Sequence, residues 1–381
     1  MNMTIERGKI GIRSSQGARG LRMALLGLAC LAALSVAASA QTYIEFNAPG
    51  ASTAPTRGTF PLSINTDEAI TGYYIDASDV YHGFVGNAGD TTTSFDVKGA
   101  FATVAHSINS AGVIAGNWSD ANAGHHGFVR AADGTITSFD APDASTKGYG
   151  KGTFPESINT AGVIAGYCNC AGEHGFVRSA SGRITNFEAP GASGTLAFSI
   201  NTDGAIAGYY LDASLVYHGF VRSADGTITS FDAPGAGTNE STVVAQGTFA
   251  LSINDDGVIV GYYVDASDGY HGFVRSADGT ITNLNAPGAG TGTSSATGYS
   301  LGTKALSIND DGVIAGYYID ASEVYHGFMV SASGTITTFN APGAGTTAAT
   351  GTFPISINNN GVIVGYFSDL GDVYQGFQQT P

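Results

Sequence analysis

The sequence predicts an all-β fold, a seven-bladed β-propeller of four-stranded antiparallel blades. Three observations lead to this prediction: a motif that recurs seven times, strands that are apolar on both sides, and incomplete repeats at the two ends of the chain. Repeats of about 40 to 50 residues with four strands each are typical of propellers. β-branched and aromatic residues are common while helix formers are few, which also favours β structure.

The recurring motif starts with a Ser-Ile-Asn triplet. Its seven copies begin at Ser63, Ser107, Ser157, Ser199, Ser252, Ser307 and Ser356. A tight turn, an Ile-x-Gly-Tyr-Tyr-like strand, a His-Gly-Phe strand and a Thr-Ile-Thr-x-Phe strand follow, ending on Ala-Pro-Gly. In residues 252–287 the Asp-Gly turns at 255–257 and 277–279 separate these segments. Such turns join neighbouring antiparallel strands, so each copy predicts a four-stranded meander.

The second strand of each repeat shows little polar alternation. In residues 258–264 the side chains are apolar or aromatic on both sides of the strand. A strand of this kind belongs to a sheet that is covered on both faces. One isolated sheet cannot achieve this, whereas blades stacked in a ring can.

The chain ends supply the third observation. The seventh repeat stops after Gln375-Gly376-Phe377, without a fourth strand, whereas residues 43–50 form a fourth strand that no repeat precedes. We therefore expect the N-terminal strand to complete the last blade and to close the ring. An open solenoid would instead need capping repeats, and the sequence has none.

Residues 1–40 differ from the rest and resemble a secretory signal peptide. A basic stretch precedes an almost wholly apolar run over 23–37, and Ala38-Ser39-Ala40 is a small-residue cleavage site. We predict cleavage after Ala40, a single propeller domain over 41–381, and an extracellular or periplasmic location. No later segment is apolar for long enough to span a membrane.

The charge of the remaining chain limits its partners. The signal peptide contains five of the 15 Lys and Arg and one of the 31 Asp and Glu, so 10 basic and 30 acidic residues remain, a net charge of −20. Such a surface repels phosphate backbones and anionic headgroups, so we expect neither nucleic acid nor membrane as a partner. Cys168 and Cys170 are the cysteines after residue 40, and whether their small ring closes stays open.

Six histidines occupy the same position of the repeat. They are His82, His126, His174, His218, His271 and His326, and Gln375 takes this place in the seventh copy. One residue repeated around a ring does not converge on a catalytic centre, so we interpret these side chains as structural hydrogen-bonding groups. The G-x-S-x-G pattern at 298–302 lies in a Gly/Thr/Ser-rich link and is interpreted as chance. We predict no catalytic residue and no metal ligand.

Candidate binding residues lie on the loops between second and third strands and the links between repeats, which share one face of the predicted disc and include the most variable lengths. They are Asp76, Asp79, Trp118, Asp120, Asp212, Asp265, Asp268, Asp320, Glu323, Asp369 and Asp372. Carboxylates three residues apart make calcium a candidate ion, although no complete calcium-loop spacing is present, so no cofactor is predicted. The neighbouring tyrosines offer flat apolar faces for sugars.

The whole repeat, with its Ile-Asn turn, Ile-x-Gly-Tyr strand, His-Gly-Phe triplet and Thr-x-Phe-x-Ala-Pro-Gly ending, resembles the bacterial extracellular HAF-repeat proteins. Gly stands in every copy where that family's name-giving triplet has Ala. The resemblance covers the chain after residue 40. It implies export and repeated β structure, and it implies no activity or catalytic residue.

Three functions remain open from the sequence. The first is a secreted, non-enzymatic binding or scaffold protein that recognises carbohydrate or another extracellular polymer through the loop face. The second is a lyase-type or other enzyme at the centre of the ring, for which the non-repeated residues His106, His125 and Glu173 are candidates. The third is a structural module that binds another protein of the cell envelope.

Overall fold

The computed structural model describes residues 41–145, 148, 150–170, 172–239 and 243–381. The chain divides into residues 1–39 and a compact unit of residues 40–381. The predicted signal peptide lies outside the described residues. The part of the chain that the structure describes contains no helix with the length and apolar character of a membrane span.

Each of the seven repeats contributes four strands, which we name A, B, C and D in chain order. The A strands are β2 (Gly58–Ile64), β6 (Ala102–Ile108), β10 (Lys151–Ile158), β14 (Gly194–Ile200), β18 (Gly247–Ile253), β22 (Gly302–Ile308) and β26 (Gly351–Ile357). The B strands are β3 (Ile70–Ile75), β7 (Ile114–Ser119), β11 (Ile164–Asn169), β15 (Ile206–Leu211), β19 (Ile259–Val264), β23 (Ile314–Ile319) and β27 (Ile363–Ser368). The C strands are β4 (Tyr81–Gly86), β8 (Gly124–Arg130), β12 (Glu173–Arg178), β16 (Tyr217–Arg222), β20 (Tyr270–Arg275), β24 (Tyr325–Val330) and β28 (Tyr374–Thr380). The D strands are β5 (Thr93–Phe95), β9 (Ile136–Phe139), β13 (Ile184–Phe187), β17 (Ile228–Phe231), β21 (Ile281–Leu284), β25 (Ile336–Phe339) and β1 (Thr42–Phe46).

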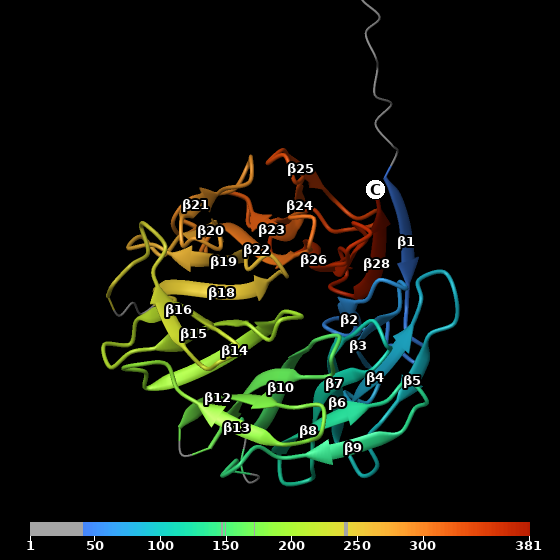
Figure 1. Ribbon diagram of the computed structural model, residues 1–381. Coiled ribbons are helices and arrows are strands. Elements are labelled where there is room, and N and C mark those ends of the chain that lie inside the picture. Colours follow the sequence, from blue (N-terminus) through green and yellow to red (C-terminus); the bar gives the residue numbers. More distant parts are fainter. Residues whose placement is uncertain (1–40, 146–147, 149, 171, 240–242) are drawn as a thin grey trace, which may run out of the picture. The chain divides into compact units, whose positions relative to one another are not determined.

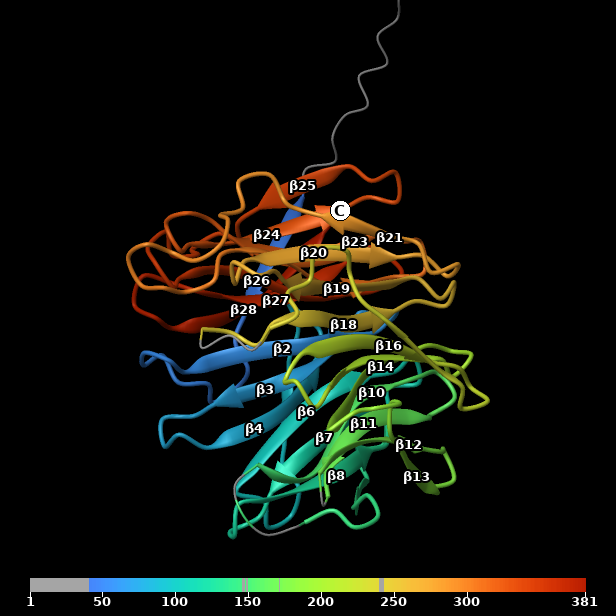
Figure 2. The same cartoon turned by 90° about the vertical axis from the view of Figure 1, so that its left-hand side faces the viewer.

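The predicted fold class needs correction, because the seven repeats are not separate four-stranded antiparallel blades. All 28 strands belong to one mixed sheet, in which the start of each C strand pairs in parallel with the start of the next A strand. Tyr81 with Ala102 and Tyr270 with Gly302 are two of these parallel pairs. The A, B and C strands thereby form a closed, barrel-like ring of 21 strands, with the seven D strands outside it. Figure 1 shows β9, β13 and β25 at the outer edge, and Figure 2 shows β2, β3 and β4 side by side.

The two ends of the chain meet in the last repeat. β1 pairs antiparallel with β28 over five residues, from Thr42 opposite Thr380 to Phe46 opposite Gly376. β28 also pairs in parallel with β2 through Tyr374 and Gly58, which joins the last repeat to the first. The N-terminal segment is thus the D strand of the seventh repeat, the pairing that the incomplete repeats at the chain ends predict.

The parallel contacts between repeats require very small side chains at the start of the A strand. Gly302 has a φ of 130°, and a Cβ atom there would lie 1.9 Å from the carbonyl oxygen of Tyr270. Six of the seven A strands have glycine at this position, and β6 has Ala102. The glycine of this position is therefore a packing requirement of the closed ring.

Seven asparagines link the repeats at the ends of the A strands. Each side-chain amide donates a hydrogen bond to the backbone carbonyl of the equivalent asparagine in the next repeat, from Asn65 to Asn109 and finally from Asn358 back to Asn65. All seven are buried, with 3 to 6% of their surface exposed. We call this closed circle the asparagine ring. It surrounds a cavity of about 230 Å³.

Apolar clusters fill the space between consecutive repeats. Each contains the phenylalanine of the His-Gly-Phe triplet, together with alanines or valines from the preceding repeat. Phe176, for example, packs with Ile158 and Ile164 of its own repeat and with Ala115 of the repeat before. These phenylalanines are completely buried. The last cluster joins Val362 and Val364 to Phe84 of the first repeat and completes the ring.

We expect Asn159→Ala to destabilise the protein by about 1–3 kcal/mol, because buried hydrogen-bonding partners are left unpaired. The Asn159 amide donates to the carbonyl of Asn201, and its Oδ1 accepts from the backbone N–H groups of Ala161 and Val163. Urea unfolding measures the change, with Thr160→Ala at the exposed neighbouring position as the control. Equal stabilities of the two variants would contradict a stabilising role of the asparagine ring.

Candidate functional site

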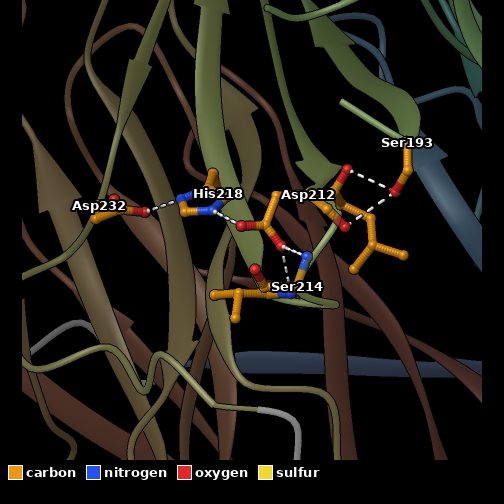
Figure 3. Close-up of polar contacts among 7 residues, drawn as sticks. Ser193, Asp212, Ser214, His218 and Asp232 are labelled. Carbon is orange, nitrogen blue, oxygen red and sulfur yellow. Dashed lines mark hydrogen bonds and ion pairs between the residues drawn. The ribbon is translucent and has the colours of Figure 1, made fainter. Parts of the chain in front are cut away.

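The aspartates that open the B–C loops hold these loops in shape. Asp212 accepts hydrogen bonds at Oδ1 from the backbone N–H groups of Ser214 and Val216, at 2.8 and 2.9 Å. Its Oδ2 lies 3.4 Å from Nε2 of His218, whose Nδ1 lies 2.8 Å from Asp232 after the D strand. Figure 3 shows this chain of contacts. Asp76, Asp120, Asp265, Asp320 and Asp369 accept the same two backbone bonds in their repeats.

The repeated histidines thus make hydrogen bonds or ion pairs, as their recurrence predicts. The bonds join the C strand to the residue after the D strand of the same repeat rather than to another repeat. About 15 to 26% of each paired imidazole is exposed. The repeated histidines therefore help to hold the B–C loops in shape.

Four B–C loops carry a second acidic residue, which contacts the neighbouring link, while its backbone N–H donates to the carbonyl of the first aspartate of the loop. Asp79 forms a two-pronged ion pair with Arg57, at 2.6 and 2.7 Å. Asp268 accepts a hydrogen bond from Gln246. Glu323 accepts bonds from the hydroxyls of Ser294 and Thr297. The backbone carbonyl of Asp372 accepts a bond from Thr56. The structure therefore spreads the predicted carboxylates over six repeats.

Trp118 occupies the position that tyrosine takes in the first repeat. Its ring stacks on His126 with 4.5 Å between the ring centres, as Tyr74 stacks on His82. The side chain packs against the cluster around Phe128. Trp118 thus contributes to packing, and the pocket described below does not include it among its lining residues.

The opposite face of the A, B and C strands carries a series of aromatic rings that runs through most of the repeats. Neighbouring residues of a strand point to opposite faces, so these rings lie across the sheet from the His82–Asp96 contact. Phe60 stacks on Tyr73 at 4.8 Å and contacts Tyr366 of the last repeat at 5.1 Å. We call this series the aromatic belt. It consists of Phe60, Phe154, Phe198, Phe249 and Phe353, Tyr73, Tyr167, Tyr209, Tyr262, Tyr317 and Tyr366, and Tyr81, Tyr217, Tyr270, Tyr325 and Tyr374.

The second repeat interrupts this aromatic belt. Val104, Asn117 and His125 stand there where the first repeat has Phe60, Tyr73 and Tyr81. The smaller side chains leave a pocket of about 520 Å³, which we call the repeat-two pocket. Its lining residues are Asp79, Tyr81, Phe101, Ala102, Val104, Asn117, Ser119, Asp120, Ala121, Ala123 and His125. Phe101 is 68% exposed and Tyr81 38%, so two aromatic rings are available beside polar groups.

A line of hydrogen-bonded polar side chains leads from this pocket. His125 Nδ1 lies 3.1 Å from the Asn117 amide, and Asn117 Oδ1 lies 2.7 Å from His106 Nε2. Nδ1 of His106 is in turn 3.5 Å from Glu156. Burial, with a contribution from His126, lowers the pKa of His125 although Asp120 opposes the shift, so this imidazole tends to be neutral.

His106 and Glu156 owe their position to a β-bulge. In each A strand one residue before the serine of Ser-Ile-Asn has no partner in the B strand, and these two residues occupy that place in β6 and β10. Bulges redirect side chains and are frequent beside functional sites. Burial raises the pKa of Glu156, with the nearby His106 opposing the shift.

The structure thus brings Asp79 and Asp120 of the sequence candidates to one pocket. It adds Phe101 and Asn117, which the sequence analysis did not select, beside the candidate His125. Glu173 is the residue of the third repeat that corresponds to Tyr81 of the first, and its backbone pairs with Gly194 of the next A strand. Cys168 and Cys170 form a disulfide in the shortened third B–C loop. Among the described residues, no three His, Cys, Asp or Glu side chains gather as a metal-binding group.

Acid should weaken the B–C loops through their first aspartates. The pKa of Asp212 lies below its ordinary value, mainly because the backbone N–H of Val216 donates to the carboxylate, with a smaller contribution from His218. Such a carboxyl stabilises the fold above its unfolded pKa, and this contribution is lost as the pH falls through its folded pKa. Asp212→Asn keeps an acceptor oxygen but does not titrate. We therefore expect its unfolding free energy to fall less between about pH 5 and pH 3 than that of the wild type.

Urea unfolding at the two pH values tests this prediction. Ser214→Ala is the control, since it keeps the backbone N–H that Asp212 binds and should retain the wild-type acid dependence. An Asp212→Asn variant with the acid dependence of the wild type would show that this carboxylate does not couple to folding.

Comparisons with known proteins define similarity of fold only. No family model matches the chain, and no curated protein does. A puromycin hydrolase is similar over 82% of this chain and 50% of its own, with 11% identity and a TM-score of 0.52. The β-propeller domain of the Trilobed protease from Pyrococcus furiosus has 13% identity over 84% of this chain and 95% of its own, with a TM-score of 0.49. TolB from Acinetobacter baumannii has 12% identity over 71% of this chain, which spans 63% of TolB, with a TM-score of 0.46. At 11% identity the similarity to the puromycin hydrolase concerns the fold alone.

Proposed function

We propose that this chain is a secreted carbohydrate-binding protein and that the repeat-two pocket is its binding site. One observation carries the proposal: the aromatic belt is interrupted where exposed aromatic rings and polar side chains line the same pocket. Ligand pockets typically combine an apolar lining with a few polar groups that fix orientation. The proposed ligand is therefore amphipathic, and its bound part consists of one or two sugar rings.

Sugars suit this combination of side chains. The flat rings of Phe101 and Tyr81 offer apolar faces against which the C–H face of a sugar can stack. Asn117 and His125 carry donors and acceptors for hydroxyl groups. The carboxylates of Asp79 and Asp120, which are held by Arg57 and by backbone N–H groups, add acceptors at the rim. A neutral ligand also avoids the repulsion that an acidic chain exerts on polyanions.

The proposal concerns one site rather than seven equivalent sites. In the first repeat the aromatic residues Phe60, Tyr73 and Tyr81 pack against one another and occupy the corresponding space. The loop carboxylates of the other repeats bind backbone groups or neighbouring links, as described above. Weak multivalent binding through all loops is thus less well supported than binding in the second repeat.

We expect Phe101→Ala to weaken binding of the recognised glycan at least about tenfold, because truncating an aromatic side chain at the centre of a binding site costs about 2 kcal/mol or more, and about 1.4 kcal/mol is tenfold in affinity. A glycan array with the secreted protein identifies the ligand, with and without calcium, and calorimetry then measures the variant. Leu370→Ala is the matched control, since Leu370 is an equally exposed apolar residue in the loop of the seventh repeat. Absence of binding to every glycan and cell-wall polymer would refute the proposed function.

Acid–base catalysis is the second candidate function, and the His106–Glu156 pair favours it. Burial raises the pKa of Glu156, groups with shifted pKa values are frequent in active sites, and no other repeat has a His–Glu pair at this position. A carboxyl whose pKa is raised by burial can hold a proton and donate it as a general acid. The proposed reaction class is cleavage of a glycan bound in the adjoining pocket.

Glu156→Gln separates these two functions. Because folding raises the pKa of Glu156, ionisation costs stability as the pH rises through the folded pKa, so we expect the variant to melt at a higher temperature than the wild type at about pH 8. Product analysis of the bound glycan measures turnover. An enzyme should lose turnover in this stabilised variant, whereas a binding protein should bind as before. Unchanged turnover would exclude Glu156 from catalysis.

A further inference from the structure

Lys304 interrupts the aromatic belt at a second place. The equivalent position of the A strand holds Phe60, Phe154, Phe249 and Phe353 in four repeats and Val104 and Leu196 in two. The Lys304 amine lies 3.8 Å from the ring centre of Tyr270 and 4.5 Å from that of Tyr262. A cation over the faces of two rings is attracted by their electron density. These rings supply no negatively charged partner.

The amine borders a second pocket, which we call the Lys304 pocket. It has a volume of about 190 Å³, and its lining residues include Tyr270, Tyr299, Ser300, Lys304, Tyr317 and Tyr325. None of these residues lines the repeat-two pocket. The inference below therefore stands independently of the proposed function.

Lys304 has no acidic partner among the described residues. The ion pairs among these residues involve Arg57 or a histidine as the cation, and none involves Lys304. Burial lowers the pKa of its amine to about 8. A buried ammonium without a counter-ion costs stability, and a bound anion would offset that cost.

We propose that the Lys304 pocket binds the carboxylate of an acidic sugar, a uronic acid, with Lys304 as the group that contacts the carboxylate. The ammonium provides the opposite charge, and a compact lysine head suits a single small anion. The phenols of Tyr299 and Tyr325 and the hydroxyl of Ser300 provide hydrogen-bonding groups for the sugar hydroxyls. The rings of Tyr270 and Tyr317 provide apolar faces for the sugar ring.

A single carboxylate fits this protein better than a polyanion does. The formal net charge of the full chain is −16, so long-range electrostatics disfavour polymers that carry many negative charges. A monosaccharide unit with one carboxylate is repelled only weakly, and it gains the local contact with Lys304. The proposed ligand is accordingly a free or terminal uronic acid.

The groups that surround Lys304 determine the pH dependence of binding. Burial raises the pKa values of the phenols of Tyr262, Tyr270, Tyr317 and Tyr325, so these rings remain neutral while Lys304 titrates. The carboxylates of Asp268 and Glu323 contribute to the raised pKa values of Tyr270 and Tyr325, and they accept hydrogen bonds from Gln246 and Ser294. Lys304 is thus the group whose charge changes around pH 8, and the proposal requires binding to weaken above that pH.

Calorimetric titration of the secreted protein with D-glucuronate and D-galacturonate tests the proposal, with D-glucose and D-galactose as neutral counterparts. We expect one of the uronates to bind at least about tenfold more tightly than its neutral counterpart at about pH 6.5, and to bind more weakly at about pH 9.5. Lys304→Met should lower the uronate affinity at least about tenfold and abolish its pH dependence. Lys304→Arg should retain most of the affinity, because the charge is kept.

The design separates this inference from the proposed function. Leu370→Ala is the matched control, since Leu370 lines neither pocket and its loss should leave uronate binding unaltered, whereas Phe101→Ala tests the repeat-two pocket. Uronate binding to Lys304→Met with wild-type affinity, or equal affinities for uronates and neutral sugars, would overturn the assignment. A separate measurement does not depend on folding of the variants: carbon-13 dimethylation of lysines allows the Lys304 amine to be titrated by NMR. Uronate must raise its pKa, and an unchanged pKa would also overturn the assignment.

Discussion

The asparagine ring is the interaction on which the arrangement of the repeats depends. Each asparagine makes the turn of its own A–B hairpin and also donates to the next repeat, so one side chain couples local and long-range structure. The link from Asn358 to Asn65 spans almost the whole sequence. Because every member is buried, a missing link leaves polar groups without partners, which makes closure of the complete circle favourable.

The ring constrains one end of the fold and leaves variation to the other. The A–B turns converge on the asparagines, whereas the B–C loops and the links between repeats vary in length and residue type. On the sheet face that carries the aromatic belt, the A-strand phenylalanine of one repeat packs against the B-strand tyrosine of the repeat before it. A smaller or polar side chain therefore opens space at one place without disturbing the circle. Val104, Asn117 and Lys304 are such places.

Much of the architecture follows from the sequence, because the motif copies fix the number of repeats and the positions of their turns. The role of β1 is predictable for the same reason, since its sequence is that of a fourth strand. The parallel contact between Tyr270 and Gly302 is not, because a repeat pattern does not specify which strand edges meet. The charge of the loop aspartates suggests binding sites, yet the carboxylate of Asp212 accepts hydrogen bonds from the backbone of its own loop. Phe101 escapes notice because it lies in a link outside the repeated motif, and the pocket beside it arises from aromatic residues that the second repeat lacks.

The residues that depart from the repeat provide the strongest argument for function. Seven copies of one motif offer seven nearly equal environments, and most repeats fill the belt with aromatic rings. Glu156 and Lys304 instead place ionisable groups in the belt. Burial raises the pKa of Glu156 and lowers that of Lys304, so it favours the neutral form of both groups. The other repeats form the same strands without them, so the fold does not require either group. Residues that lower stability without serving the fold are expected where a protein binds or reacts with a ligand.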